Sequence, residues 1–433
     1  MNKHNEDMEI GILGLWHLGC VYSTGLAKYG YKVTGFDTDQ QIVARLNKST
    51  PPVFEPNLVE EINNHLNKNL TFTSDPIKAI KHKKYVFITL DVPVDNHDKL
   101  IIRPLNNLIR LVLLHCSPGT AVVVSSQVPV GTMRNLHQKL MQKNGSLGIC
   151  FPENVRLGQA FKTFLKPDRI VLGIDAKSSL INFKKDFPIF NCPALDMSFE
   201  SAEMVKHTLN SYLAVMISFA SEVCDICELI GADYSKVLSA LRSDSRVSPS
   251  APLNPGIGFA GGTIGRDIQV LKSITAKLDY SPKLIKTAYQ VNQDRLDKLI
   301  NKTQFLLGNI KGKNIGLLGL TYKPGTDTLR RSKSLELAHR LISKGAAVRG
   351  YDPAIKPAVK LPVKIDVAEN LASFFNQLDL AITMTPWLEF KNITADDLKP
   401  MKKYLVLDAL NILSPDLKKQ LPSLKYLRTG VSQ

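Results

Sequence analysis

The segment most able to carry chemistry is NPGIGFAGGTIGRD, at residues 254–267, which holds five glycines. Glycine weakens helices and strands, and it permits sharp turns and close approach to the backbone. The segment ends in Arg266 and Asp267, and Thr263 supplies a hydroxyl just before them. The backbone there must turn sharply or approach something closely. Whether Thr263 takes part in chemistry stays open at this point.

A second glycine turn lies near the start of the chain. A short apolar stretch breaks at Gly14 and Gly19, a helical stretch follows, and a second apolar stretch ends at Asp37. This order is typical of a dinucleotide site, in which the helix N-terminus holds the pyrophosphate and the acid holds a ribose hydroxyl. Aspartate would repel a 2′-phosphate, which favours NAD over NADP. Trp16 replaces the middle glycine, so its indole must point away or the cofactor must shift.

The elements that must hold these segments form three blocks. Residues 1–196 alternate strands and helices, which predicts a doubly wound α/β domain that binds NAD. Apolar residues then recur at helical spacing over 198–233, and another helix is predicted over 266–300. Residues 197–304 are therefore expected to form a central helical domain, and its long helix is a candidate dimer surface. Four further strands of the first block are predicted at 84–90, 121–129, 147–152 and 169–174.

The opening pattern recurs in the last block. NIGLLGLTYKPG (314–325) repeats the pattern of EIGILGLWHLG (9–19), and GAAVRGYDPAI (345–355) repeats that of GYKVTGFDTDQ (30–40). Residues 305–433 are therefore predicted to form a second Rossmann-like domain, with strands near LDLAITMT and KYLVLDAL. The fold class expected is α/β, with two Rossmann-like doubly wound domains joined by a central helical dimerisation region.

The composition indicates which class of partner the chain binds. The 433 residues carry 55 Lys and Arg against 39 Asp and Glu, for a net charge of +16. The basic residues are spread rather than clustered, which favours an anionic small substrate over nucleic acid. Apolar runs are too short for a membrane span, and no signal peptide is evident, so the cytoplasm is expected. The six cysteines are expected to be reduced core thiols, and the CxxC at Cys224 and Cys227 lacks the companions of a metal site.

The chain resembles the UDP-glucose/GDP-mannose dehydrogenase family in motifs that keep the family's order over nearly its whole length. They are GFDTD (35–39), FEPNL (54–58), SSQVPVGT (125–132), FPENVRLGQAF (151–161), PDRIVLG (167–173), SAEMVKHTLNSYLA (201–214), NPGIGFAGGTIGRD, GLTYKPGTDTLRRS (319–332), YDP (351–353) and TPWLEF (385–390). The resemblance implies an N-terminal NAD domain, a central dimerising helix and a C-terminal nucleotide-sugar domain. It also implies oxidation of a sugar C6 alcohol to a carboxylate with two NAD. The aldehyde stage would be held on a cysteine as a thiohemiacetal, oxidised to a thioester and hydrolysed.

The resemblance also implies which residues react. Lys206 and Asn210 match donors one helical turn apart, which would face the negative charge that builds on the C6 oxygen. Asp267 matches an acid that would orient a water or act as base, although it also suits the first turn of a helix. Glu153 matches a glutamate that would contact the substrate or assist hydrolysis. Thr263 occupies the position of the family's cysteine.

Binding residues follow from the same match. The cofactor-binding residues expected are Gly14, Trp16, His17, Leu18, Gly19, Asp37 and Arg330. The substrate-binding residues expected are Arg246, Phe259, Gly262 and Lys323. Arg246, Lys323 and Arg330 would supply cations opposite a pyrophosphate.

Several positions depart from the family pattern. A hydroxyl such as that of Thr263 is a poor nucleophile unless a base takes its proton, so the covalent route is in question. The other departures are Trp16 for glycine, Val92 and Gln127 for threonines, Leu157 for an acid and Leu410 for an arginine. Such a cluster of changes predicts altered chemistry or lost activity.

Three functions stay open on sequence alone. The first is NAD-dependent oxidation of a UDP-sugar, of the UDP-glucose or UDP-N-acetylhexosamine type, to the aldehyde or uronic acid for polysaccharide precursors. The second is a catalytically impaired nucleotide-sugar or NAD binding protein of the same fold. The third is a hydroxyacid or 6-phosphogluconate-type dehydrogenase, which a C-terminal parallel sheet would argue against. We favour the first, as a homodimer without a metal.

Overall fold

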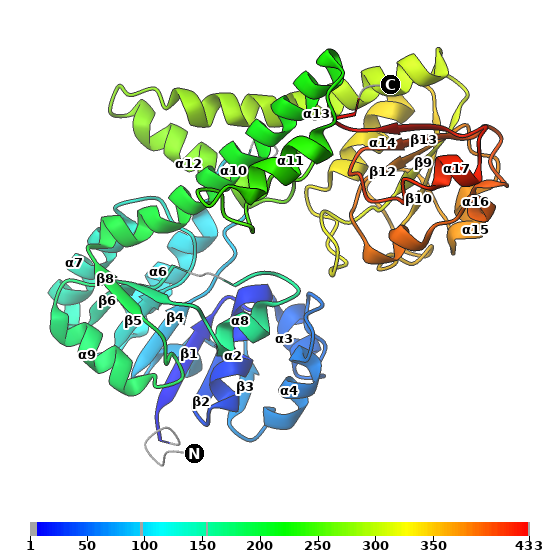
Figure 1. Cartoon of the computed structure of the whole chain (residues 1–433). Coiled ribbons are helices and arrows are strands. Elements are labelled where there is room, and N and C mark those ends of the chain that lie inside the picture. Colours follow the sequence, from blue (N-terminus) through cyan, green and yellow to red (C-terminus); the bar gives the residue numbers. More distant parts are fainter. Residues whose placement is uncertain (1–6, 96–97, 153–154, 432–433) are drawn as a thin grey trace. The chain divides into compact units, whose positions relative to one another are not determined.

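The computed structural model describes residues 7–95, 98–152 and 155–431 (Figure 1). The chain divides into two compact units. The N-terminal unit comprises Met1–Leu209 with Gln269–Asp279, and the C-terminal unit comprises Asn210–Ile268 with Tyr280–Gln433. The predicted α/β class is confirmed, whereas the division into three domains at 196 and 304 stays a prediction.

The N-terminal unit is built on an eight-stranded sheet of order β3-β2-β1-β4-β5-β6-β7-β8. All strand pairs are parallel except β6 with β7. The order reverses between β1 and β4, which is where open α/β sheets bind ligands at the carboxyl ends of their strands. The strands are β1 Glu9–Leu13, β2 Lys32–Phe36, β3 Leu70–Thr73, β4 Tyr85–Ile88, β5 Ala121–Val124, β6 Leu147–Cys150, β7 Ile170–Gly173 and β8 Ala194–Met197.

Helices cover both faces of this sheet because successive strand residues point to opposite faces and both sets are apolar. Tyr85 and Phe87 of β4 pack in one core cluster, and Val86 and Ile88 pack in the other. The helices are α2 His17–Lys28, α3 Gln40–Leu46, α4 Leu58–His65, α5 Pro76–Ile80, α6 Arg103–His115, α7 Thr132–Asn144, α8 Ala160–Leu165 and α9 Lys177–Asp186. The sequence prediction missed β3 and β8.

The C-terminal unit holds a six-stranded sheet of order β11-β10-β9-β12-β13-β14, in which every pair is parallel. This sheet confirms the second Rossmann-like fold and argues against a hydroxyacid or 6-phosphogluconate-type dehydrogenase that ends in helices. Its strands are β9 Asn314–Leu318, β10 Ala347–Tyr351, β11 Asp366–Val367, β12 Leu380–Thr383, β13 Leu405–Asp408 and β14 Lys425–Arg428. The shorter helices around it are α14 Lys333–Ser343, α15 Leu371–Phe375, η1 Leu388–Asn392, α16 Ala395–Leu398 and α17 Leu417–Gln420.

Four helices make up the central part: α10 Phe199–Ile230, α11 Tyr234–Ser243, α12 Ile264–Ala276 and α13 Lys283–Leu307. The single helix predicted over 266–300 is wrong, because α12 and α13 are separate. Asp279 has a positive φ of 52° and Pro282 lies at the N-cap of α13, so the helix cannot continue through them. None of the described helices is both long and apolar enough to cross a bilayer.

The repeat seen in the sequence is also a structural repeat. Gly14 and Gly319 follow the first strand of each sheet with φ values of 97° and 101°, which favour glycine. The next backbone N–H donates to the carboxylate after the second strand, at 2.7 Å from Asp37 in one unit and 2.7 Å from Asp352 in the other. Each unit therefore carries the same strand, glycine turn and acid.

Candidate active site and nucleotide crevices

The first glycine turn is dictated by close packing. A Cβ on Gly14 would lie 2.8 Å from the Cα of Leu90, and one on Gly19 would lie 1.8 Å from the Gly14 carbonyl oxygen. Both positions therefore require glycine, so that α2 can start directly at the carboxyl end of β1. The predicted residues Gly14 to Gly19 thus lie at the point where the strand order reverses.

The N-terminus of α2 suits a phosphate. Its N-cap is Trp16, which makes no side-chain cap hydrogen bond, and the first turn holds no acidic residue. Uncapped N–H groups and the helix dipole attract an anion. Trp16 is 40% exposed, so a large part of the residue is in contact with solvent. The turn therefore fits a pyrophosphate despite the missing glycine.

Asp37 suits a ribose. It is half-buried, and its two oxygens accept the N–H groups of Leu15 at 2.7 Å and Asp39 at 2.9 Å. An ionised carboxylate offers about four acceptor positions, so about two are left for ribose hydroxyls. Together with the uncapped α2, this acid fits NAD in the N-terminal unit.

The corresponding acid of the C-terminal unit, Asp352, accepts its hydrogen bonds from the protein. Asp352 is buried, and one of its oxygens accepts from Leu320 N at 2.7 Å, Thr321 N at 2.9 Å and Trp387 Nε1 at 3.0 Å. The YDP and TPWLEF motifs therefore meet here. Because donors of the protein itself occupy this carboxylate, Asp352 offers a ribose fewer free acceptor positions than Asp37 does.

Glu55 is a buried acid near the first glycine turn, and the sequence analysis did not single it out. Its buried carboxylate lies 2.8 Å from His17 Nε2 and accepts the N–H groups of Gly158 at 2.8 Å and Ala160 at 2.7 Å. Burial alone would raise the pKa of Glu55, but the hydrogen bonds from His17 and the two N–H groups outweigh it and lower the pKa. Glu55 thus ties the start of α2 to the segment before α8. FEPNL, which contains it, was the only available signal.

Replacing Glu55 by glutamine is expected to lower the free energy of unfolding at neutral pH by about 2 kcal/mol, because charge-assisted hydrogen bonds are lost. The folded pKa is depressed, so the stabilisation is complete above the unfolded value of about 4.3 and is lost as pH falls through the folded value. Urea unfolding followed over this range checks this, with exposed Glu60→Gln as control. A difference between wild type and Glu55→Gln that persists unchanged at acid pH would contradict it.

Lys206 lies in the N-terminal unit, half-buried on α10. It lines a small cavity with Ser125–Val128, Cys150, Pro152 and Glu203, and the departure Gln127 is therefore its neighbour there. Glu203 is buried, which raises its pKa, and it accepts two N–H groups at the start of α7. This acid caps a helix, whereas Lys206 is the cation of the cavity.

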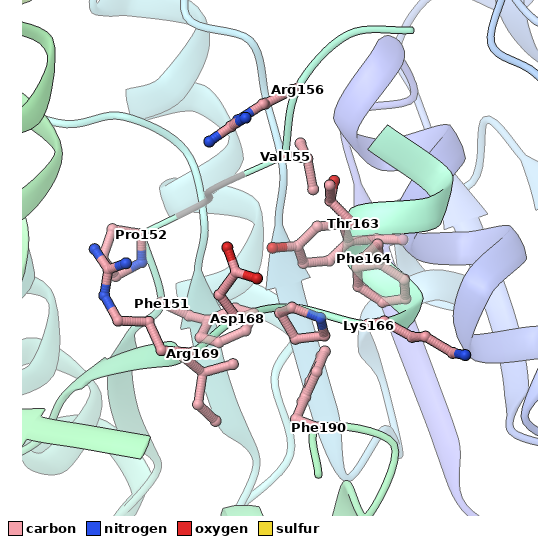
Figure 2. A pocket seen from close by; sticks show the side chains of 13 residues that line it. Phe151, Pro152, Val155, Arg156, Thr163, Phe164, Lys166, Asp168, Arg169 and Phe190 are labelled. Carbon is pink, nitrogen blue, oxygen red and sulfur yellow. The ribbon is translucent and has the colours of Figure 1, made fainter. Parts of the chain in front are cut away.

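Glu153 lies outside the described residues, so its predicted role cannot be placed in the fold. The segments next to it line a cavity of about 230 Å³ (Figure 2). Phe151, Phe164 and Phe190 contribute aromatic rings, Asp168 lies among them, and Lys166 extends away from the group. The described residues that line this cavity include none of the predicted site residues.

In the C-terminal unit, the predicted site residues Asn210 and Asp267 lie in direct contact. Asp267 is fully buried, the Asn210 side-chain amide donates to its carboxylate, and Arg266 Nε lies 3.9 Å from the other oxygen. One hydrogen bond from the amide and an ion-pair contact with the guanidinium thus hold this carboxylate in the first turn of α12. Lys206 precedes Asn210 by four residues on α10, or about one helical turn.

Thr263 is exposed and immediately precedes α12. Its carbonyl oxygen accepts the N–H of Asp267 at 3.2 Å, which makes it the N-cap of that helix, a position that threonine favours. Among the described residues, none hydrogen-bonds the Thr263 hydroxyl. Among the described residues the hydroxyl therefore has no hydrogen bond to a base, and a structural role at the helix start accounts for the residue.

The rest of the glycine loop is held by neighbouring segments. Gly258 has a φ of 92°, and a Cβ there would lie 2.1 Å from Asn292 Oδ1, which accepts the Phe259 N–H at 2.7 Å. A Cβ on Gly262 would meet the Arg330 guanidinium at 3.3 Å. The glycines of this loop thus allow close packing against other side chains of the protein itself. Phe259 packs in a buried cluster, so its predicted substrate contact stays a prediction.

A cavity of about 260 Å³ lies at the carboxyl ends of β9 and β12, where the strand order of this sheet reverses. We call it the β9–β12 cavity. It is lined by Ile217, Ser221, Pro252, Asn254–Gly258, Ala260, Thr321–Pro324, Lys333, Ser334, Met384, Pro386 and Leu410. The predicted substrate residue Lys323 and the departure Leu410 are thus brought together, and Lys333 and Ser334 are additions that the sequence did not reveal.

Arg246 is not brought to this cavity. Its guanidinium is 87% exposed and pairs with Asp244, at 2.9 and 2.7 Å. That partner raises the pKa of Arg246 and holds the pKa of Asp244 at about 2. The substrate contact predicted for Arg246 and the NAD contact predicted for Arg330 stay predictions.

The cysteines are free thiols, and all but half-buried Cys192 are buried, as predicted. Burial raises the pKa of Cys224 to about 12, which suits an inert core thiol. Over the described ranges, His, Cys, Asp and Glu side chains form no group of three or more that could hold a metal ion.

Three models of one family match successive parts of the chain. Residues 8–187 match the NAD binding domain of the UDP-glucose/GDP-mannose dehydrogenase family, residues 200–294 its central domain and residues 316–415 its UDP binding domain. A UDP-glucose 6-dehydrogenase of Rickettsia bellii is 31% identical, over 94% of this chain and 96% of that protein. One of Bacillus subtilis is 29% identical, over 94% and 90%. The solved UDP-glucose dehydrogenase of Pyrobaculum islandicum superposes with a TM-score of 0.89, at 26% identity, over 100% of both chains.

Proposed function

The chain belongs to the UDP-glucose/GDP-mannose dehydrogenase family, and we propose that it catalyses the NAD-dependent oxidation of a UDP-sugar at C6. The observation that carries this proposal is the buried pair of Asn210 and Asp267. Asn210 lies one helical turn along α10 from Lys206. A buried acid fixed by an amide and a guanidinium is costly to maintain, and an active site gives a reason for it.

The residues would divide the work as follows. Lys206 and Asn210 would donate to the C6 oxygen as negative charge develops there. Asp267, held in place by Asn210 and Arg266, would accept the proton of the C6 hydroxyl, directly or through a water. Gly14–Gly19 and Asp37 would hold NAD, which would supply the hydride acceptor for this oxidation.

Thr263 limits how far the reaction goes. The covalent route to the acid needs an activated nucleophile, whereas the Thr263 hydroxyl has no hydrogen bond to a base in the described ranges. We therefore propose a single oxidation, in which the C6 alcohol and NAD give the C6 aldehyde, NADH and a proton.

The test is to mix purified protein with NAD and each of a panel of UDP-hexoses and UDP-N-acetylhexosamines, and to follow NADH. NADH that requires both the protein and one UDP-sugar supports the proposal. UDP-sugar binding without any NADH would instead support a catalytically impaired binding protein. The panel also decides between the two sugar types, which Leu157 in place of an acid leaves open, and a polysaccharide precursor is the product class expected.

The apolar surface of α10 supports a homodimer. Tyr212, Phe219 and Ile226 recur every seven residues along the helix and are 52%, 47% and 52% exposed. A stripe of large apolar side chains at this spacing favours pairing with another helix. A cytoplasmic location is proposed with it, since the six thiols are free.

Substituting aspartate for both Phe219 and Ile226 is expected to convert the dimer to a monomer, raising the dimer dissociation constant by about a hundredfold or more, because burying two such side chains contributes roughly 3 kcal/mol or more. Light scattering coupled to size-exclusion chromatography measures this. The control is Leu388→Asp, which alters an equally apolar side chain that is 76% exposed on η1. A monomeric wild type, or a variant that stays dimeric, would contradict the assignment.

A further inference from the structure

Lys333 is a buried lysine whose burial the fold does not explain. It is the first residue of α14 and only 6% exposed. Its ammonium lies 3.5 Å from a Glu336 carboxylate whose other oxygen is taken by Arg340 at 2.8 Å. Burial lowers the pKa of Lys333 more than Glu336 restores it. A buried ammonium with so weak a partner is costly, so a stronger anionic partner is to be expected.

The next residue points to the same place. Ser334 is 1% exposed, and its hydroxyl has no hydrogen-bond partner among the described residues. Buried polar atoms are nearly always hydrogen-bonded, so an orphan hydroxyl calls for an explanation. Both Lys333 and Ser334 line the β9–β12 cavity. The cavity thus offers an ammonium and a hydroxyl that the protein itself leaves largely unused.

Leu410 adds a third observation. The family resemblance led us to expect an arginine at this position, and the leucine side chain lines the same cavity beside the glycine loop, 3.7 Å from where a Cβ on Gly256 would lie. The cavity has therefore lost a cation at the end of β13 and carries one at the start of α14.

We propose that Lys333 and Ser334 bind the diphosphate of the UDP-sugar in the β9–β12 cavity, and that Lys333 supplies the charge missing at Leu410. The proposal rests on the proposed function. A lysine ammonium and a hydroxyl match phosphate oxygens through charge-assisted hydrogen bonds, and the first turn of α14 adds its dipole. The apolar part of the lining, including Ile217 and Met384, suits the base instead.

The alternative is that Lys333 serves only to pair with Glu336 and stabilise α14. The two readings differ in what they predict for ligands with and without phosphate. If Lys333 has only a structural role, replacing it should change the binding of UDP and of uridine equally. If Lys333 binds the diphosphate, replacing it should weaken the binding of UDP alone.

The experiment is calorimetric titration of full-length protein with UDP and with uridine. Lys333→Met is expected to weaken UDP binding roughly ten- to hundredfold and to leave uridine unchanged. Lys333→Met combined with Leu410→Arg is expected to regain most of the UDP affinity. Lys344→Met, at the exposed end of the same helix, is the matched control and should bind UDP as wild type does. Should Lys333→Met fail to fold, Ser334→Ala is expected to weaken UDP several-fold, again without changing uridine.

Each other outcome has a definite meaning. Unchanged UDP binding in Lys333→Met, or an equal loss of UDP and uridine, would overturn the proposal while leaving the proposed function standing. A wild-type protein that binds no UDP would overturn the proposed function and this inference together.

Discussion

Lys206→Met is expected to lower the turnover number for NADH formation by about a hundred- to thousandfold, the loss typical of removing one donor to a developing oxyanion. Methionine keeps the length and apolar character of the lysine stem. It should therefore occupy the same half-buried space beside Gln127. Only the ammonium is lost. Initial rates at saturating NAD and UDP-sugar measure the effect.

The control for this variant is Lys236→Met, which alters an exposed lysine on α11. UDP affinity is expected to stay within about twofold of wild type in Lys206→Met, because the β9–β12 cavity is lined by other residues. Turnover as fast as wild type would mean that Lys206 is an ordinary solvated helix residue. It would contradict the proposal that its ammonium donates to the C6 oxygen.

Thr263→Cys is expected to change the reaction itself, from one NADH per UDP-sugar to two. A thiol at the N-cap of α12 would have a lowered pKa, since the helix N-terminus stabilises a thiolate. The thiolate would add to the C6 aldehyde, the adduct would lose a hydride to a second NAD, and water would cleave the resulting thioester to the carboxylate and free thiol. Product analysis by mass would show the uronic acid.

Thr263→Ser is the matched control, because it keeps a hydroxyl at the N-cap and should still give one NADH per sugar. Thr263→Ala should keep the first oxidation as well, at a small cost in the stability of α12 of about 1 kcal/mol. Loss of all activity in Thr263→Ala, with the fold intact, would mean that the hydroxyl takes part in the first step and would contradict the single-oxidation scheme.

The parts of the fold that were predicted from sequence are those set by local rules. Gly14 and Gly319 need a positive φ after a short apolar strand, and Asp37 and Asp352 end the next strand. These signals depend only on neighbours in the chain, so the two Rossmann-like sheets could be recognised. A strand such as β8, whose two central residues are exposed, has no comparable apolar pattern in the sequence.

The residues that escaped prediction owe their roles to distant partners. Glu55 is bound by residues about 100 positions away, Gly158 and Ala160, and no spacing in the sequence reveals that contact. Lys333 resembles any charged residue at the start of a helix until the cavity around it is known. Arg246 shows a local contact that spacing alone did not reveal, since the guanidinium is paired with Asp244 two residues away, and its substrate contact stays a prediction.

Asn210 and Asp267 are an intermediate case. Their residue types and the family motifs identified them, but only the fold shows that the amide donates directly to a carboxylate with no solvent exposure. The family match alone would have left Asp267 equally readable as a helix-start acid. Complete burial, the hydrogen bond from Asn210 and the nearby guanidinium of Arg266 together favour the proposal of a catalytic acid or base.

The most direct test of the single oxidation is the number of NADH molecules formed per UDP-sugar consumed, measured to exhaustion with wild-type protein. We expect one, with the C6 aldehyde or its hydrate as product. Two NADH and a uronic acid would show that Thr263 is no obstacle and would contradict the single oxidation. No NADH, with UDP still bound, would contradict catalysis altogether and leave a nucleotide-sugar binding protein of the same fold.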